Sequence, residues 1–317
     1  MNVKRYSRKE MKIFITNIIG EKCEVMPIGN HELNRHLVYR INTTNNSFVF
    51  KFYYKKEVAE NEILALRETK FIDIPTPSII ETGFIEDDRE WLLMNRIEGF
   101  PLAKFAKFIN HNNLKDIYYD MGKFLARLHK HSSSKDCRYF KDTTNLTTQT
   151  SCKAYFEKQN NDFIENIITN NLNSNIISSA INYYYANLDI LDIKSNYSFC
   201  HNDYDGRNVL IAKTNGTWKI SAILDFERSM YMDRTIDFCF MYINQFHFDK
   251  TYENSFFQGY KSVYSLPTNF KKHFEFFLLI QCLRLFSWSK DIVPMLHKTS
   301  YDIIKDILNN NVKIDNN

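Results

Sequence analysis

The first hundred residues combine short β-prone runs with one amphipathic segment. Leu37–Ile41 and Phe48–Tyr53 are rich in β-branched and aromatic residues, and the polar linker Asn42–Asn46 separates them. Apolar residues then recur at helical spacing from Lys56 to Thr69, and a further apolar strand is predicted at Trp91–Asn95. This pattern predicts a small sheet accompanied by a helix.

The rest of the chain reads as mainly helical. Helical periodicity covers Leu114–His131, Tyr155–Ile168, Ile176–Leu191 and Phe270–Lys290, and the last of these is apolar enough to be a core helix. Ser132–Cys152 is polar and is expected to form an irregular connection. Strands followed by helices indicate an α+β fold with two unequal parts.

One hairpin interrupts the helical region. Val209–Ala212 and Lys219–Leu224 are β-prone, and Asn215-Gly216 between them is the dipeptide that a type I′ turn prefers. A two-residue turn would pair Thr214 with Thr217 and place Asn208 opposite Ile223. Asp225 would then lie about 7 Å farther along the strand.

The hairpin gathers oxygen-bearing side chains at one end. Asn208 and Asp225 would meet there, beside the loop that carries Asp203. An amide oxygen and two carboxylates suit Mg²⁺, which prefers a few protein oxygens together with substrate phosphates. A surface hairpin with a polar loop would explain any one of these residues, but not all of them in this order. The arrangement predicts a phosphoryl-transfer site.

Composition narrows the class of protein. A chain of 317 residues is long enough for two lobes, and a net charge of +4 gives no argument for binding nucleic acid or a membrane. The six cysteines have no metal-binding spacing, and no apolar leader follows Met1, so we expect a cytoplasmic protein with reduced thiols. The most apolar run, Phe276–Ile280, is too short to span a bilayer.

The motif His201-x-Asp203-x4-Asn208, followed by a hairpin and Asp225-Phe226, resembles the kinase-like fold. It is most similar to the aminoglycoside phosphotransferase and choline kinase superfamily. Asn202 stands where protein kinases carry arginine, and Glu227 stands in place of glycine. The resemblance implies a protein-kinase-like fold, with a nucleotide-binding lobe over residues 1–98 and a catalytic and acceptor-binding lobe over 99–317.

Roles for individual residues follow from the same resemblance. Asp203 would be the catalytic base that orients the substrate hydroxyl, and Asn208 and Asp225 would hold Mg²⁺ between the nucleotide phosphates. Lys51 would contact these phosphates and pair with a helix glutamate, for which spacing favours Glu62 while Glu60 stays open. The alternative interpretation is that Lys51 is a charge placed on an edge strand to prevent aggregation. Asp237 would brace the catalytic loop from the following helix, and His129 is expected to pack rather than to catalyse.

The remaining nucleotide contacts are expected at a hinge and a loop. Asn95 and Ile97 would read the adenine edge through their backbone groups, with Met94 flanking the pocket. A plain exit from a strand is the competing interpretation. Pro27–His36 has one glycine and is not a phosphate cradle by itself. It agrees with the glycine-poor loop of the aminoglycoside phosphotransferases.

The predicted function is O-phosphorylation of a small hydroxyl-bearing molecule with ATP, or alternatively GTP, and Mg²⁺. The acceptor could be an aminoglycoside, which would make the protein an antibiotic-resistance kinase, or a metabolite such as choline, ethanolamine, homoserine or a sugar. A non-catalytic scaffold of the same fold is a third option. The enzyme is expected to be a monomer or homodimer, with its acceptor bound by Phe156–Asn187 and Phe246–Trp288.

Charge gives a modest indication of the acceptor. Residues 1–98 carry 15 basic and 15 acidic residues, which leaves 26 and 22 for residues 99–317. The second lobe is therefore +4, yet four acidic residues lie close to the catalytic motif in sequence: Asp203, Asp205, Glu227 and Asp233. This cluster allows a cationic acceptor and makes a strongly anionic one the less favoured expectation.

Overall fold

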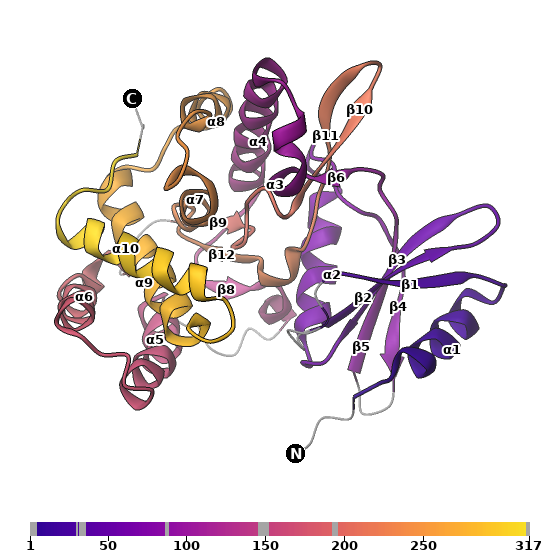
Figure 1. The fold of residues 1–317 in the computed structure, drawn as a ribbon, viewed down its shortest axis with the longest axis horizontal. Helices are drawn as coiled ribbons and strands as arrows, with labels where there is room; N and C mark the ends of the chain where they lie inside the picture. The colour runs from indigo at the N-terminus through magenta and orange to yellow at the C-terminus, as the bar shows by residue number, and fades with distance from the viewer. Residues whose placement is uncertain are drawn as a thin grey trace.

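The computed structural model describes residues 5–29, 31, 36–85, 89–144, 152–191 and 196–314. An antiparallel sheet and two helices form the N-terminal lobe, and a larger, mostly helical lobe follows (Figure 1). The expected α+β, protein-kinase-like fold is confirmed. Half of the predicted loop Pro27–His36 lies outside the described residues, since residues 30 and 32–35 are not among them.

The N-terminal sheet has five strands in the order β1-β2-β3-β5-β4. The strands are β1 (Glu24–Ile28), β2 (His36–Asn42), β3 (Ser47–Tyr53), β4 (Ile79–Ile85) and β5 (Arg89–Asn95). In the central strand β3, Lys51 pairs with Val38 on one side and Leu92 on the other. Lys51 is therefore in the middle of the sheet, which rules out the edge-strand interpretation.

Each face of this sheet is covered by one helix. α1 (Arg8–Ile19) buries Met11 and Ile15 against the aromatic residues Phe50 and Phe52. α2 (Val58–Thr69) covers the face toward the helical lobe, as Figure 1 shows. α1 was not predicted, because its apolar face is short.

The C-terminal lobe is built from eight helices within the described ranges. They are α3 (Leu102–Phe105), α4 (His111–His131), α5 (Cys152–Thr169), α6 (Asn175–Ala186), α7 (Ile236–Met241), α8 (Glu253–Lys261), α9 (Phe270–Ser289) and α10 (Pro294–Leu308). Short 3₁₀ turns cover Ala106–Phe108, Phe140–Thr144, Leu188–Leu191 and Phe226–Arg228, and a π-helical turn covers Tyr242–Phe246. The helix predicted to end at Leu191 therefore ends at Ala186 and continues as a 3₁₀ turn.

Two glycines let α4 and α8 cross in close contact. A Cβ atom on Gly122 would lie 2.0 Å from the carbonyl oxygen of Phe256, and one on Gly259 would lie 1.9 Å from that of Tyr119. No larger residue fits either position without moving a helix. This crossing fixes α4, whose last turn carries His129, against the core.

The helix α9 is buried on all sides from Phe276 to Leu283, as predicted for a core helix, and its first turn carries the exposed Lys271. No helix in the described part of the chain is both long and apolar enough to cross a membrane. Cys23, Cys137, Cys200, Cys239 and Cys282 are all free thiols, and all but Cys23 are buried. The four buried cysteines agree with the expected packing of these side chains.

Two small sheets complete the lobe. β10 (Val209–Thr214) and β11 (Thr217–Ile223) form the predicted hairpin, to which β6 (Phe100–Pro101) is added. The other sheet has the order β7-β9-β12-β8 and contains β7 (Ser133–Ser134), β8 (Arg138–Tyr139), β9 (Tyr197–Cys200) and β12 (Met230–Met232). The catalytic motif connects β9 to β10.

Candidate active site

Asp237 holds the loop that begins at His201. Its Oδ2 atom accepts a hydrogen bond from the backbone N–H of His201 at 2.8 Å, and its Oδ1 atom accepts one from that of Asn202 at 2.5 Å. Asn202 has a positive φ of 60°, a conformation in which asparagine is favoured among larger residues. The predicted brace from the helix that follows the motif is therefore confirmed.

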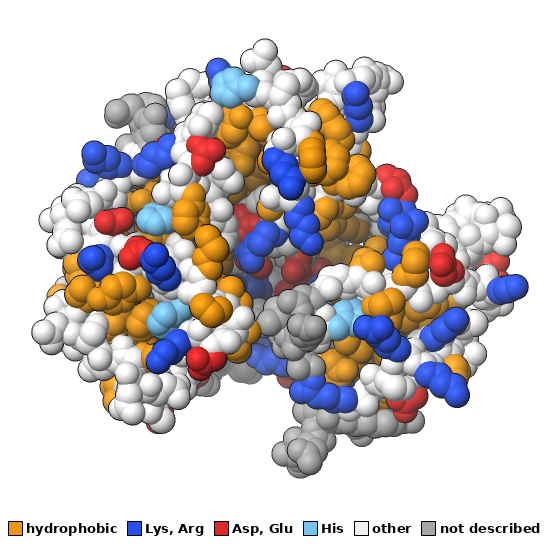
Figure 2. All heavy atoms as spheres, viewed as in Figure 1, with side chains coloured by type: hydrophobic (Ala, Val, Ile, Leu, Met, Phe, Trp, Pro, Cys, Tyr) orange, Lys and Arg blue, Asp and Glu red, His pale blue; other side chains and the backbone are white. Residues whose placement is uncertain are grey.

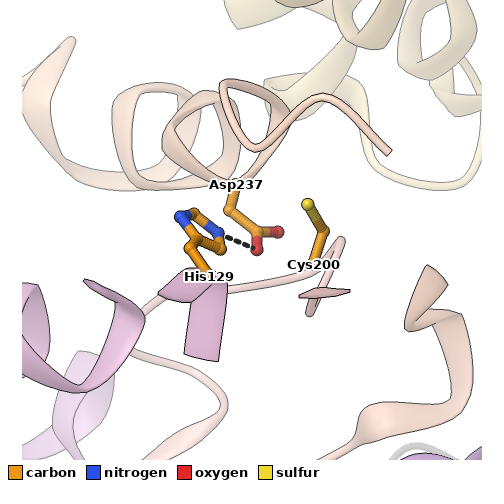
Figure 3. A group of neighbouring side chains, drawn as sticks. All are labelled: His129, Cys200 and Asp237. Atoms are coloured by element: carbon orange, nitrogen blue, oxygen red, sulfur yellow. Dashed lines mark hydrogen bonds and ion pairs between the residues drawn. The ribbon is translucent and has the colours of Figure 1, made fainter. Parts of the chain in front are cut away.

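His129 supports Asp237 from the opposite side. Figure 3 shows the two side chains directed toward each other, with His129 Nε2 donating to Asp237 Oδ2 at 2.9 Å. Burial lowers the pKa of His129, although Asp237 opposes the shift. In the neutral imidazole, Nδ1 is free to accept from the Tyr260 hydroxyl at 2.9 Å. This histidine is a packed structural residue, as predicted.

Cys200 lies beside this pair but makes no metal site with it. The three side chains could in principle approach one ion, since their ligand atoms lie within 4.8 Å of one another (Figure 3). Burial raises the pKa of the Cys200 thiol well above its usual value, and a metal would need the thiolate. His129 and Asp237 are also committed to protein partners, so we interpret the group as a scaffold.

Asp203 and Asn208 lie on the same loop and face different partners. Asp203 Oδ1 accepts from an Arg207 guanidinium nitrogen at 3.0 Å. Asn208 Nδ2 donates to the carbonyl oxygen of Asp203 at 2.8 Å, which leaves the amide Oδ1 atom as the group available to a ligand. Arg207 also forms a bidentate pair with buried Asp205, so the loop is internally crosslinked.

A β-bulge changes the register of the hairpin. Thr214 pairs with Thr217 as predicted, and positive φ values at Asn215 and Gly216 agree with a type I′ turn. The pairing shifts by one residue between Leu210 and Ile211. Asn208 is consequently opposite Leu224, and the Leu224 N–H donates to the Asn208 carbonyl oxygen at 2.8 Å.

The predicted partner, Ile223, was therefore wrong by one residue. The shift places Asn208 one residue closer to Asp225 along the strand. His201 reinforces the same junction, because its Nε2 atom donates to the Leu224 carbonyl at 2.9 Å.

Lys51 is the centre of a cluster of three carboxylates. Its Nζ atom lies 2.8 Å from Glu62 Oε2, 2.7 Å from Asp225 Oδ1 and 2.8 Å from Glu227 Oε2. Burial alone would lower the pKa of Lys51, but Asp225 and Glu62 raise it well above its ordinary value. Lys51 is therefore a permanent cation that joins β3, α2 and the segment after β11.

The structure pairs Lys51 with Glu62 rather than with Glu60. Glu62 is 2% exposed and also accepts a hydrogen bond from the Tyr53 hydroxyl. Glu60 lies on the exposed side of α2. The position that spacing favoured is the one that forms the buried ion pair.

Glu227 is part of this cluster, although the sequence predicted no contact between it and Lys51. Lys51 and His36 together lower the pKa of Glu227 although its burial would raise it. Asn61 fixes the same segment to α2, since its Nδ2 atom donates to the carbonyls of Glu227 and Ser229 at 3.0 Å each. No short motif in the sequence indicates these contacts.

The hinge residues lie at the end of β5, next to the start of the helical lobe. Met94 is buried in the core, and the Asn95 N–H donates to the Ser78 carbonyl at 3.1 Å. A nucleotide contact at Asn95 would therefore use its carbonyl oxygen. Ile97 follows in the connection to β6. β5 pairs directly with β3, the strand that carries Lys51, so that Met94 lies opposite Val49 and Asn95 opposite Phe48.

Comparison with known proteins identifies the family. A family model described as phosphotransferase enzyme family (APH) matches residues 24–271, which is well over half of the chain. The chain belongs to this phosphotransferase family. A search of curated protein sequences finds no match to it.

Solved structures show the same fold as this phosphotransferase at low sequence identity. A thermostable mutant of aminoglycoside phosphotransferase APH(4)-Ia superposes with a TM-score of 0.70 at 12% identity, covering 94% of this chain and 98% of that one. The GDP complex of aminoglycoside 2'-phosphotransferase-IIIa gives 0.67 at 11%, with 97% and 100% covered. ADP-bound APH(2'')-Ib gives 0.63 at 15%, with 95% and 99% covered.

The oxygen atoms expected to bind Mg²⁺ fit that ion. Asn208 presents an amide oxygen, and Asp225 has a positive φ of 66° that turns the chain immediately after β11. Asp225, Glu62 and Glu227 have carboxylate oxygens within 4.8 Å of one another. Hard oxygen donors of this kind suit Mg²⁺. In this phosphotransferase Lys51 occupies the centre of the three carboxylates. Asp225 is the most exposed of the three, so it is the carboxylate best placed to bind a metal ion in addition to Lys51.

A cavity of about 670 Å³ opens beside Asp203. Phe240, Arg284, Trp288 and Leu296 contribute to its walls. Arg284 and Trp288 fall in the predicted acceptor region Phe246–Trp288, whereas none of the residues lining this cavity comes from Phe156–Asn187. Figure 2 shows basic and acidic side chains gathered in the hollow between the two lobes.

Proposed function

We propose that this phosphotransferase transfers the γ-phosphoryl group of ATP to a hydroxyl group of a small molecule. One observation carries the proposal: Lys51, Glu62 and Asp225 meet at ion-pair distances although they belong to three separate elements. No packing requirement gathers three charged groups in a buried position. A phosphoryl-transfer site requires such a group, because it must hold negative phosphates and a cation together.

The proposed chemistry uses Asp203 and Lys51. A bond forms between the acceptor oxygen and the γ-phosphorus, and the bond from that phosphorus to the β–γ bridging oxygen breaks, so that ADP leaves. Asp203 orients the hydroxyl and receives its proton, and Arg207 fixes the rotamer of Asp203 from 3.0 Å. Lys51 supplies positive charge to the nucleotide phosphates, with Glu62 holding its ammonium in place.

Asn208 and Asp225 are proposed to hold Mg²⁺. When bound, this ion would neutralise charge on the phosphates and keep them aligned for transfer. The bulge in the hairpin, the Asn208–Leu224 hydrogen bond and His201 all determine the spacing of the two residues.

The nucleotide is proposed to lie against the hinge, with the Asn95 carbonyl and the Ile97 backbone at the base and Met94 flanking it. ATP is the expected donor and GTP the alternative. Complexes of related structures support a nucleotide, since their descriptions name ADP, AMP-PNP and GDP. A cytoplasmic location, a monomer or homodimer, and a lobe boundary near residue 98 are part of the same proposal.

Nucleotide binding by Asp225→Ala tests this assignment. Wild-type protein should show a rise in Tm with ATP and Mg²⁺ that is larger than with ATP and EDTA. Asp225→Ala should lose that Mg²⁺-dependent part while retaining a cooperative unfolding transition. Asp189→Ala is the matched control, because Asp189 is 73% exposed in its side chain and lies on a separate 3₁₀ turn. Equal Mg²⁺-dependent shifts in wild type and Asp225→Ala would contradict the proposal.

A non-catalytic scaffold of this fold is the alternative function. It would not require Asp203, Asn208, Asp225 and the Lys51–Glu62 pair to be present together. An aminoglycoside acceptor rests on the similarity to structures such as the APH(4)-Ia ternary complex with ADP and hygromycin B, and that similarity concerns the fold.

A further inference from the structure

The cavity beside Asp203 has an unequal distribution of charge. Asp203 is the one carboxylate in its wall, whereas Arg207, Arg228 and Arg284 contribute three guanidinium groups. Apolar side chains such as Phe240 and Trp288 form much of the rest. A volume of about 670 Å³ is in the usual range for a small-molecule site.

Two of these arginines lack a counterion in the described part of the chain. Arg207 is paired with Asp205 and Asp203, but neither Arg228 nor Arg284 forms an ion pair with a described carboxylate. The Nε atom of Arg284 is fully buried and has no hydrogen-bond partner there. Both guanidinium groups lie over the same Phe240 ring, at 5.4 and 5.9 Å from its centroid.

This arrangement costs stability unless a ligand compensates for it. Burial, followed by the neighbouring charge of Arg228, lowers the pKa of Arg284 to about 9, so Arg284 is still a cation at neutral pH. Two adjacent, partly buried cations repel each other, and the buried Nε–H of Arg284 loses its hydration without gaining an acceptor. Guanidinium groups are well suited to bidentate binding of carboxylates and phosphates.

The acidic residues counted around the motif do not offset these charges. Asp205 is paired with Arg207, Glu227 with Lys51, and Asp233 with His273 at 2.7 Å. Asp203 is the only one of the four that lines the cavity. The sequence-based expectation, which allowed a cationic acceptor and disfavoured a strongly anionic one, depended on carboxylates that are already paired.

We propose that the acceptor of this enzyme carries an anionic group, a carboxylate or a phosphate, which Arg228 and Arg284 bind while its hydroxyl lies at Asp203. The proposal rests on the proposed kinase activity and names the chemical class of its substrate. A polycationic aminoglycoside is excluded by the same geometry, because it would face two unpaired arginines.

Matched pairs of acceptors test the class. Glycerate is compared with glycerol, and ribose 5-phosphate with ribose, so that each pair differs in the anionic group; kanamycin represents the polycations. ADP release should be faster with at least one anionic member than with its neutral partner, and kanamycin should not be phosphorylated. A preference for the neutral members or for kanamycin, or no response to either anion, would overturn the proposal. The pair that responds distinguishes a carboxylate from a phosphate.

Arg284→Gln tests the residue. The KM for the anionic acceptor should rise roughly 10- to 100-fold, as expected for lost hydrogen bonds to a charged group, while the Kd for ATP and Mg²⁺ stays unchanged. Arg284→Lys should recover only part of the loss, and Arg228→Gln provides a second variant on another element. Lys271→Gln is the control, since it removes a positive charge from the exposed face of the same helix. An unchanged KM, or an equal loss of ATP affinity, would contradict the proposal.

Direct binding separates this inference from the proposed function. Calorimetric titration of glycerate and ribose 5-phosphate into the nucleotide-free protein should show saturable binding of at least one, and Arg284→Gln should abolish it. Failure of the wild type to bind ATP would refute the kinase activity alone. Failure to bind either anion while ATP binds would refute the anionic acceptor alone.

Discussion

Lys51 Nζ lies 2.7 Å from Asp225 Oδ1, although 174 residues separate them in the chain. The contact joins the middle of the N-terminal sheet to the end of the hairpin in the helical lobe. Glu62 and Glu227 complete the surroundings of the same ammonium group. Together with the Asn61 hydrogen bonds to the Glu227 and Ser229 carbonyls, this buried lysine joins the two lobes.

Lys51→Met should impair nucleotide use and stability together. We expect kcat/KM for ATP to fall by roughly 10²-fold, since the variant loses the positive charge that stabilises the transferring phosphoryl group. The free energy of unfolding should fall by about 3 kcal/mol, because three carboxylates lose their common counterion. Steady-state kinetics and urea denaturation measure the two effects. Lys213→Met, on the exposed part of β10, should change neither.

His129 predicts a dependence of stability on pH. Its pKa is lowered in the folded protein, so the unfolded chain takes up a proton first as the pH falls below about 6.5. The stabilising contribution is therefore present above this pH and is lost as the pH decreases toward the folded-state value. One proton limits the slope to about 1.4 kcal/mol per pH unit.

Urea denaturation between pH 7.5 and 5.5 measures this slope in wild type and in His129→Gln. The variant should show a flatter dependence, with lower stability at pH 7.5. His111→Gln is the control, because His111 lies on the surface at the start of α4. The interpretation fails if His129→Gln retains the full wild-type slope.

Gly122→Ala should loosen the contact between α4 and α8. Its Cβ atom would lie 2.0 Å from the Phe256 carbonyl oxygen, so the helices must separate. Overpacking of this kind costs about 1–3 kcal/mol, which differential scanning calorimetry detects as a lower Tm. Wild-type stability in this variant would show that the two helices are not in such close contact.

Local patterns were enough to predict most of the elements that carry the site. The strand containing Lys51, the hairpin and its turn, and the long helices all follow from periodicity and turn residues. α1 was missed, although Ser7 and Glu10 form a capping box that is visible in the sequence. Its apolar positions were too few to indicate a helix without that signal.

The bulge could not be predicted from the hairpin's own sequence, and it lies against a residue that is distant in the chain. It occurs where β11 passes Gly99, whose Cβ would meet Ser221 Oγ at 2.6 Å. The pairing of Asp205, Glu227 and Asp233 is likewise a matter of tertiary contact. A count of nearby acidic residues does not show which of their charges are already paired, and the structure does.

Asn208→Ala should separate metal binding from folding. The side chain contributes one hydrogen bond to the Asp203 carbonyl, so the loss of stability should be about 1 kcal/mol. The concentration of Mg²⁺ needed for half-maximal ADP release should rise at least several-fold. A titration with Mg²⁺ at fixed ATP measures this value. An unchanged requirement for Mg²⁺ would remove Asn208 from the metal site.

Transfer of label from [γ-³²P]ATP by wild type and Asp203→Asn tests the central claim most directly. With an accepted hydroxyl compound and Mg²⁺, the wild type should move the label to that compound. Asp203→Asn should lower kcat by roughly 10²-fold or more and leave the Kd for ATP unchanged, because the carboxylate acts on the acceptor. Undiminished transfer by Asp203→Asn, or no transfer by the wild type to any acceptor while ATP is bound, would contradict the account.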